Sequence, residues 1–164
     1  MSSLLHSKAH RLTKLLQIKY PILSAPMAAT ASGKLAGSVS KAGGLGMIGG
    51  GYLDQHKDMK LWIQEQFQEA EKITNGTLPI GIGFISWCLI KQPDLLLYSL
   101  ELNPKCVMLS FGDIPKEFIQ EIHSRGVLLI CQVQTVQQAL TVAKQGADII
   151  VAQGSEAGKK ILKF

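Results

Sequence analysis

The stretch that decides the fold is QGADIIVAQGSEAG, which runs from Gln145 to Gly158. It holds a glycine where a helix should end, an unbroken apolar run, and then a glycine-rich loop. An apolar run without alternation is typical of a strand buried on both faces, as in a parallel sheet covered by helices. We therefore expect a strand over Asp148–Ala152, buried on both faces, that leads into a loop suited to a phosphate or a flavin.

The same order of short apolar runs and longer amphipathic segments extends back to Tyr20. We expect strands at Pro21–Ala25, Gly46–Ile48, Leu78–Phe84, Lys105–Ser110, Val127–Val133 and Asp148–Ala152. We expect helices at Lys34–Lys41, Gln55–Glu71, Asp94–Leu100, Pro115–Ser124 and Val136–Gln145. This α/β pattern fits either an open doubly wound sheet or most of an eight-stranded (β/α) barrel. No repeat or linker divides residues 1–164, so we expect a single domain.

Composition narrows the class of protein. The 164 residues are 46% hydrophobic and 18% charged, which is typical of a globular domain. The net charge of +5 is spread along the chain, so we expect no nucleic-acid partner. No apolar run approaches the roughly 20 residues that cross a bilayer, so we expect no membrane partner.

The cysteines and histidines show no spacing typical of a metal site. Cys88, Cys106 and Cys131 are far apart in apolar runs, which argues against a zinc ribbon or a disulfide framework and indicates a reducing compartment. The histidines fall on the N-terminal arm or on expected helices. They are His6, His10, His56 and His123. We therefore expect no metal site.

The N-terminal arm, residues 1–19, has no acidic residue and mixes basic and leucine positions. We expect a short amphipathic helix that closes one end of the barrel. The alternative is a mitochondrial presequence, which has the same composition. The expected location is accordingly the cytoplasm, with the mitochondrion as the alternative.

Candidate binding residues follow the expected strands, where parallel α/β folds place their sites. Glycines there allow close approach of a flat ring or a phosphate, and amide side chains such as Gln132 and Gln153 can both donate and accept hydrogen bonds. The candidate segments are Ala25–Ala28, Gly49–Gly51, Gly81–Phe84, Ser110–Asp113, Gln132 with Gln134, and Gln153–Ser155. The acids Asp113 and Glu156 could act as bases, but we favour loop-ordering roles. The run at 42–46 precedes a strand and so is no dinucleotide fingerprint.

These residues resemble the nitronate monooxygenase family, formerly called 2-nitropropane dioxygenases. The matching motifs are PILSAPM (Pro21–Met27), SKAGGLGMIG (Ser40–Gly49), QGAD (Gln145–Asp148) and VAQGSEAG (Val151–Gly158). The match covers Tyr20 to Gly158, and the segments 83–87 and 132–135 look most like a eukaryotic, fungal-type branch.

The resemblance implies a TIM-type barrel with non-covalently bound FMN, which oxidises alkyl nitronates with O₂ to a carbonyl compound and nitrite. It implies that the backbone of Ala25, Pro26 and Met27 packs against the flavin. It also implies that Gly83, Gln132 and Gln153 line the ring edge, and that Gly158 approaches it from the last loop.

The chain departs from the family after Gly158. The family motif continues with Gly and a catalytic His, whereas here Lys159 and Lys160 follow. We expect Lys160 at most to hold an anionic nitronate and leave the catalytic residue unassigned. The tail 159–164 is divergent, and the last two strands of the barrel are not present. We therefore expect an incomplete barrel of about six strands with impaired activity.

Two alternatives stay open at this point. One is an FMN-dependent enoyl-acyl-carrier reductase, which shares the same style of motifs, and the other is a non-catalytic truncated fragment. An inosine monophosphate dehydrogenase-like barrel is disfavoured because no loop cysteine follows a glycine-rich strand end. The oligomeric state is not indicated.

Overall fold

The computed structural model of the chain describes residues 2–51 and 57–154, with side chains from Ala9 onward. The helices are α1 (Ser2–Leu16), α2 (Gly33–Lys41), α3 (Met59–Thr74), α4 (Ser86–Leu89), α5 (Asp94–Glu101), α6 (Lys116–Ser124) and α7 (Val136–Gln145). The strands are β1 (Gly46–Gly51), β2 (Ile80–Ile85), β3 (Cys106–Ser110), β4 (Leu128–Val133) and β5 (Ile149–Ala152).

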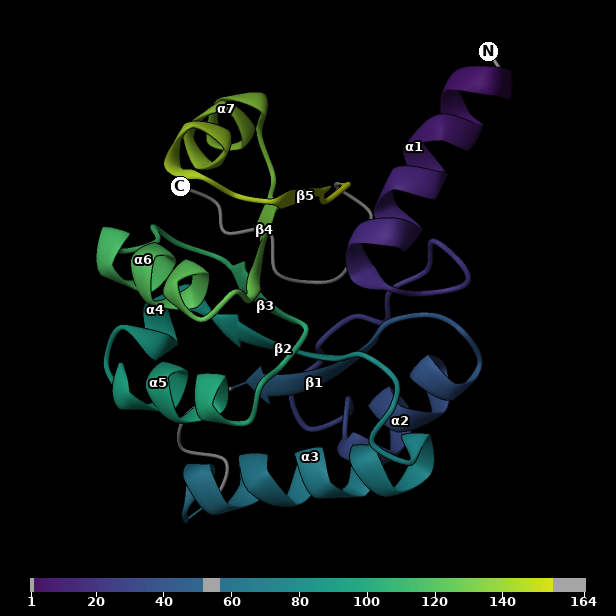
Figure 1. The fold of residues 1–164 in the computed structure, drawn as a ribbon. Coiled ribbons are helices and arrows are strands. Elements are labelled where there is room, and N and C mark those ends of the chain that lie inside the picture. Colours follow the sequence, from purple (N-terminus) through teal and green to yellow (C-terminus); the bar gives the residue numbers. More distant parts are fainter. Residues whose placement is uncertain (1, 52–56, 155–164) are drawn as a thin grey trace.

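In the described residues the strands form one parallel sheet in the order β1-β2-β3-β4-β5. Helices separate the strands in sequence, as parallel crossovers require. Figure 1 shows α7, α6, α5 and α3 following one another around the outer side of the strands. This sequential order with helices outside is that of part of a (β/α) barrel, and it confirms the expected fold class.

Apolar side chains fill both faces of β1 to β4. On the outer face, Ile82, Val107 and Leu129 pack with the helices in the larger core cluster. On the inner face, Met108 and Ile130 belong to a second, smaller cluster. Alternate residues of each strand point to opposite faces, so these unbroken apolar runs supply both clusters at once.

Helix α3 shows how local sequence fixes an element. Asp58 accepts a hydrogen bond from the Leu61 backbone N–H at 3.0 Å, and Asn75 ends the helix in the left-handed conformation. The residues that α3 buries are Met59, Ile63, Phe67, Ala70 and Thr74, which lie at helical spacing. The helix therefore starts and ends three to four residues later than the expected range because of these caps.

Helix α1 lies against the inner face of the sheet near the amino ends of the strands. Leu16 is fully buried in the inner cluster, and Leu12 and Ile18 pack against the same cluster. Lys105, at the start of β3, donates a hydrogen bond from Nζ to Oε1 of Gln17 at 3.1 Å. This is the position expected of a helix that closes one end of a barrel.

The first expected strand is wrong. The segment Pro21–Ala25 makes only an isolated parallel bridge, between Leu23 and Leu45. The Ser24 hydroxyl takes the next place and accepts the Met47 backbone N–H at 2.9 Å. A side-chain oxygen thus replaces a backbone carbonyl as the acceptor of one hydrogen bond between the two segments. Pro26, which has no N–H, cannot donate a further hydrogen bond of a parallel sheet.

The expected burial of β5 is also wrong. Its residues alternate between half-buried and exposed positions, and the Ile150 side chain is 38% exposed. The neighbouring helix α7 buries none of its residues. Among the described residues, no further element covers the outer edge of β5, so its apolar sequence does not produce two-sided burial.

None of the helices within residues 2–51 and 57–154 combines the length and apolarity needed to cross a membrane.

Candidate functional site

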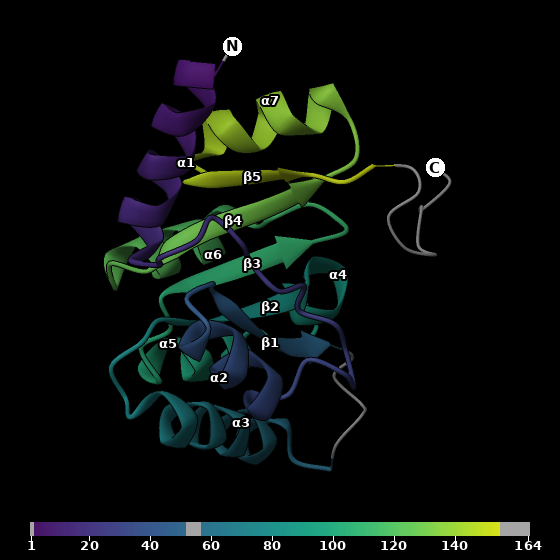
Figure 2. The ribbon, with the colours of Figure 1, turned by 90° about the vertical axis from the view of Figure 1, so that its right-hand side faces the viewer.

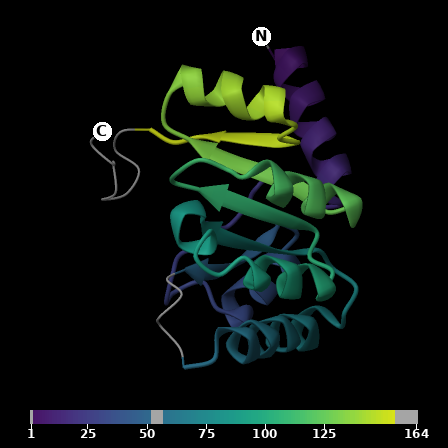
Figure 3. The same ribbon diagram turned by 90° about the vertical axis from the view of Figure 1, so that its left-hand side faces the viewer.

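A cavity of about 560 Å³ opens where all five strands end. Its size lies within the range of small-molecule and cofactor sites. Figures 2 and 3 show, from opposite sides, that the strands run in one direction and therefore end at the same edge. The lining residues are Ala25, Pro26, Met27, Ala28, Gly51, Gly83, Phe84, Ile85, Ser110, Phe111, Gln132, Val151, Ala152, Gln153 and Gly154.

The structure brings together every described residue that the sequence predicts at the cofactor. These residues come from four separate segments of the chain and now line one cavity. They are Ala25, Pro26, Met27, Gly83, Gln132 and Gln153. Gly158 and Lys160, the other two positions singled out, lie outside the described residues, as does Glu156.

The loop at 25–31 is fixed mostly by its own backbone. The N–H groups of Thr30 and Ala31 donate to the Met27 carbonyl, at 3.2 and 2.8 Å, and Gly49 in β1 donates to the Ala31 carbonyl at 2.8 Å. Ala29 takes a positive φ of 59°, which this tight turn imposes. The Met27 side chain remains 45% exposed at the mouth of the cavity. This loop thus forms a wall of fixed backbone.

Two glycines of the strands make room for the 25–28 loop. A Cβ on Gly83 would lie 2.4 Å from the Pro26 ring, and one on Gly49 would lie 2.4 Å from the Met27 carbonyl oxygen. The space that these glycines leave is therefore filled by the 25–28 loop. They bring that loop close to β1 and β2, and the ligand would meet the loop first.

Phe84, Ile85, Phe111 and Val151 provide the apolar walls of the cavity, and of these the candidate segments include Phe84 and Phe111 but not Ile85 or Val151. Phe111 has a φ of 62°, unusual for a bulky residue, and is followed by Gly112 at 121°. Apolar residues at strand ends cannot be told from core residues by sequence pattern alone. The short helix α4, which begins directly after β2, was missed for the same reason.

Amide side chains supply the hydrogen-bonding groups of the cavity. Gln153 continues the β4–β5 ladder, because its backbone N–H donates to the Val133 carbonyl at 2.9 Å. Its side-chain Oε1 accepts a hydrogen bond from Nε2 of Gln134 at 2.8 Å. Gln132, half-buried in β4, lines the same cavity. None of the described lining residues is ionisable, so they are suited to a neutral, flat group with polar edges.

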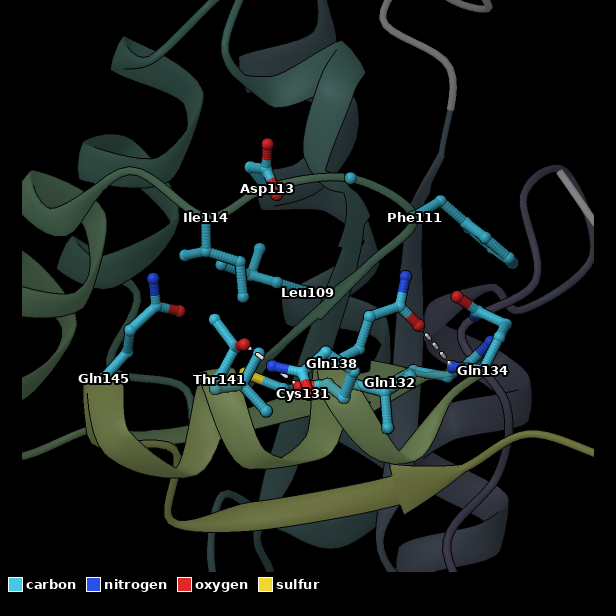
Figure 4. A pocket seen from close by; sticks show the side chains of 14 residues that line it. Leu109, Phe111, Asp113, Ile114, Cys131, Gln132, Gln134, Gln138, Thr141 and Gln145 are labelled. Atoms are coloured by element: carbon cyan, nitrogen blue, oxygen red, sulfur yellow. Dashed lines mark hydrogen bonds between the residues drawn. The ribbon is translucent and has the colours of Figure 1, made fainter. Parts of the chain in front are cut away.

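A second cavity of about 280 Å³ lies between the β3–α6 loop and α7, with Phe111 and Gln132 shared between the two (Figure 4). Asp113 lines this second cavity and not the first, so it is not placed as a base for the first. Burial, reinforced by the nearby Asp148 carboxylate, raises the pKa of the Cys131 thiol in its wall to about 12. That thiol is therefore protonated at neutral pH and a poor nucleophile.

His123, Asp148 and the remaining cysteines are not among the residues that line the first cavity. His123 Nε2 lies 3.0 Å from Oδ2 of Asp148, which also accepts the Leu129 backbone N–H at 2.7 Å. Cys88 and Cys106 are buried and form no disulfide within the described part of the chain. Within the described ranges, no three His, Cys, Asp or Glu side chains gather as metal ligands would.

Parallel (β/α) units around a cavity at the carboxyl ends of the strands place this chain in the TIM-barrel class, of which it holds part. Residues 9–96 and 92–161 match the family model of nitronate monooxygenase. The chain belongs to the nitronate monooxygenase family.

Curated relatives agree with this assignment. A probable nitronate monooxygenase of Staphylococcus aureus (strain Newman) is 28% identical over 181 residues, which cover 91% of this chain and 50% of the relative. One of Staphylococcus haemolyticus is 29% identical, with 91% and 49% covered. The chain thus spans about half the length of the curated relatives it matches.

Among solved structures, FabK from Thermotoga maritima is similar, with a TM-score of 0.75 and 31% identity over 88% of this chain and 43% of FabK. A nitroalkane oxidase from Streptomyces ansochromogenes has a TM-score of 0.69 and 24% identity, over 90% of this chain and 49% of that one. The second likeness shows the fold alone.

Proposed function

We propose that this chain carries the flavin-ring site of an FMN-dependent oxidoreductase that oxidises alkyl nitronates with O₂. The observation that carries the proposal is the convergence of Ala25–Met27, Gly83, Gln132 and Gln153 on one cavity at the strand ends. These segments are far apart in the sequence, and only the (β/α) fold brings them to one cavity. Family membership supplies the nitronate substrate class.

The described residues fit the ring part of FMN. Phe84, Phe111 and Val151 offer apolar surface to the faces of the ring, and the Gln132 and Gln153 amides can bond its polar edge. Bound FMN would supply the redox chemistry, and the protein would supply orientation and hydrogen bonds. No Lys, Arg or His is among the described lining residues, so these residues fit the ring of FMN and not its phosphate.

The Pro26 ring and the backbone of the 25–28 loop would then set how closely a substrate can approach. Because Gly83 lets Pro26 sit directly against β2, this wall is rigid and would hold the ring in one plane. The small-molecule substrate and O₂ would enter beside Met27, whose side chain is half-exposed at the mouth. The proton-transferring group is left unassigned, because Lys159 and Lys160 stand where the family motif has Gly and a catalytic His.

The test is a titration of purified residues 1–164 with FMN, followed by the visible spectrum and the quenching of flavin fluorescence. Gln132→Ala should weaken binding about tenfold, as expected for one lost hydrogen bond to the ring. Gln137→Ala, on the outer helix α7, should leave it unchanged. Wild-type protein that neither binds FMN nor alters its spectrum would overturn the proposal.

A second candidate is an FMN-dependent enoyl-acyl-carrier reductase, favoured by the likeness to FabK at 31% identity. The two activities consume different substrates. O₂-dependent release of nitrite from propane-2-nitronate supports the first, and oxidation of a reduced nicotinamide that depends on an enoyl thioester supports the second. A protein that binds FMN and does neither would be a non-catalytic fragment.

We further propose that the chain belongs to a eukaryotic, fungal-type branch of the family, on the strength of segments 83–87 and 132–135. A family tree that groups it with the bacterial members would overturn this placement. We also propose a cytoplasmic location, which imaging of the tagged full chain in its source cells would test. Import into mitochondria would contradict it.

A further inference from the structure

We propose that Gln134 is a positioning residue that fixes which end of the Gln153 side-chain amide meets the ligand, so that Gln153 acts there as a hydrogen-bond donor. This inference rests on the flavin-ring site proposed above. Gln134 does not line that cavity itself, and it acts through Gln153.

The backbone of Gln134 is held in place by the start of helix α7. Thr135 caps the helix, and its hydroxyl accepts the Gln138 backbone N–H at 3.1 Å. In return, Oε1 of Gln138 accepts the backbone N–H groups of Gln134, at 2.9 Å, and of Thr135, at 3.1 Å. This capping box fixes the chain at Gln134, because both partners of each bond belong to one rigid turn.

The side chain of Gln134 then reaches the neighbouring strand end. Its Nε2 donates to Oε1 of Gln153 at 2.8 Å, and Gln153 is anchored independently by its backbone bond to Val133. We call the bond between the two side chains the amide clasp. The clasp joins the loop after β4 to the loop after β5, so it also holds this side of the cavity together.

The amide clasp determines whether the Gln153 side chain presents a hydrogen-bond donor or an acceptor to the ligand. A primary amide has an acceptor oxygen and a donor nitrogen at opposite ends of one planar group. When the oxygen faces Gln134, the amino group is turned away from Gln134. Gln153 would therefore pair with a ring acceptor, such as a carbonyl oxygen or an imine nitrogen, and not with the ring N–H.

Isosteric and charge variants separate this role from a merely structural one. Gln134→Glu offers only acceptor oxygens, so it should turn the Gln153 amide around and present its oxygen to the ligand. Gln134→Lys retains a donor and should leave the amide as it is. The matched controls are Gln137→Glu and Gln137→Lys, which make the same charge changes on α7 at an exposed position.

The first measurement uses flavin-free protein labelled with ¹⁵N. The Gln134 side-chain NH₂ should show slowed exchange with water and a nuclear Overhauser contact to the Gln153 side chain, and Gln153→Ala should abolish both. Absence of these signals in folded wild-type protein would overturn the clasp, whatever the flavin does.

The second measurement is FMN affinity and the midpoint potential of the bound flavin. Gln134→Glu should bind FMN about tenfold more weakly and at a lower potential, because the reduced ring loses a donor, while Gln134→Lys and both controls stay within about threefold of wild type. Equal loss in the Glu and Lys variants, or no change in either, would overturn this inference alone. Failure of wild-type protein to bind FMN would overturn the proposed function, and this inference with it.

Discussion

The two ends of the sheet are built from similar sequence but are covered very differently. Strands β1 to β4 have apolar residues packed on both faces, under helices such as α3 and α6. At the other end, β5 is half-exposed and α7 buries no residue, with Val136 78% and Leu140 53% exposed. An apolar sequence thus does not by itself make a strand buried, since burial requires that other elements pack on both faces of the strand. Stability should be concentrated in the first region and function at the border between the two.

The largest expected effect is a glycine substitution that tests backbone packing. A Cβ on Gly46 in β1 would lie 1.7 Å from the Ala36 carbonyl oxygen in α2, so Gly46→Ala should cost more than about 4 kcal/mol of unfolding free energy. Gly146, which ends α7, has only ordinary contacts for a Cβ but a φ of 107°. Gly146→Ala should cost about 1–2 kcal/mol from backbone strain. Urea unfolding curves measure both, and equal costs would contradict the comparison.

A smaller effect is expected from truncating apolar side chains in the two regions. Ile63 in α3 is fully buried, so Ile63→Ala should lower the unfolding free energy by about 2–5 kcal/mol. Leu140→Ala in α7 should change it by less than about 0.5 kcal/mol. Leu61→Ala, at an exposed position of α3, separates helix propensity from burial. A large loss for Leu140→Ala would mean that α7 is covered in solution.

The smallest effect concerns the two thiols with raised pKa. Burial raises the pKa of both Cys106 and Cys131 from 9.0 to about 12, so between pH 9 and 12 the unfolded chain binds fewer protons than the folded one. Stability should be unaffected by the thiols below pH 9 and then fall, by at most about 1.4 kcal/mol per pH unit for each thiol. Urea midpoints at pH 8, 9 and 10 check this, and Cys106→Ala should reduce the slope. A flat profile above pH 9 would contradict burial of these thiols.

Sequence predicted the strand-and-helix order well because each element carries its own signal. Gly146 ends α7 in the left-handed conformation, and the Thr135 capping box starts it, so the observed bounds equal the expected range Val136–Gln145. The six described residues that we expect at the cofactor also line one cavity, because parallel strands bring their carboxyl ends to one edge.

The errors came from contacts that no local pattern records. The segment at 21–25 looks like a strand, but a hydroxyl of Ser24 replaces one of its ladder bonds. The sequence also did not indicate that Pro26, from a distant segment, packs against Gly83, which lines the cavity. Likewise, Gln134 was a candidate by its place after a strand, but its hydrogen bond to Gln153 could not be read from the sequence.

Leu16 has a consequence for the order in which the chain folds during synthesis. Leu16 is synthesised before Cys106 and Ile130, which belong to the cluster that buries it. The Leu16 side chain therefore stays exposed during synthesis until β4 has been made. Until then, a chaperone that binds nascent apolar segments could bind helix α1 at Leu16.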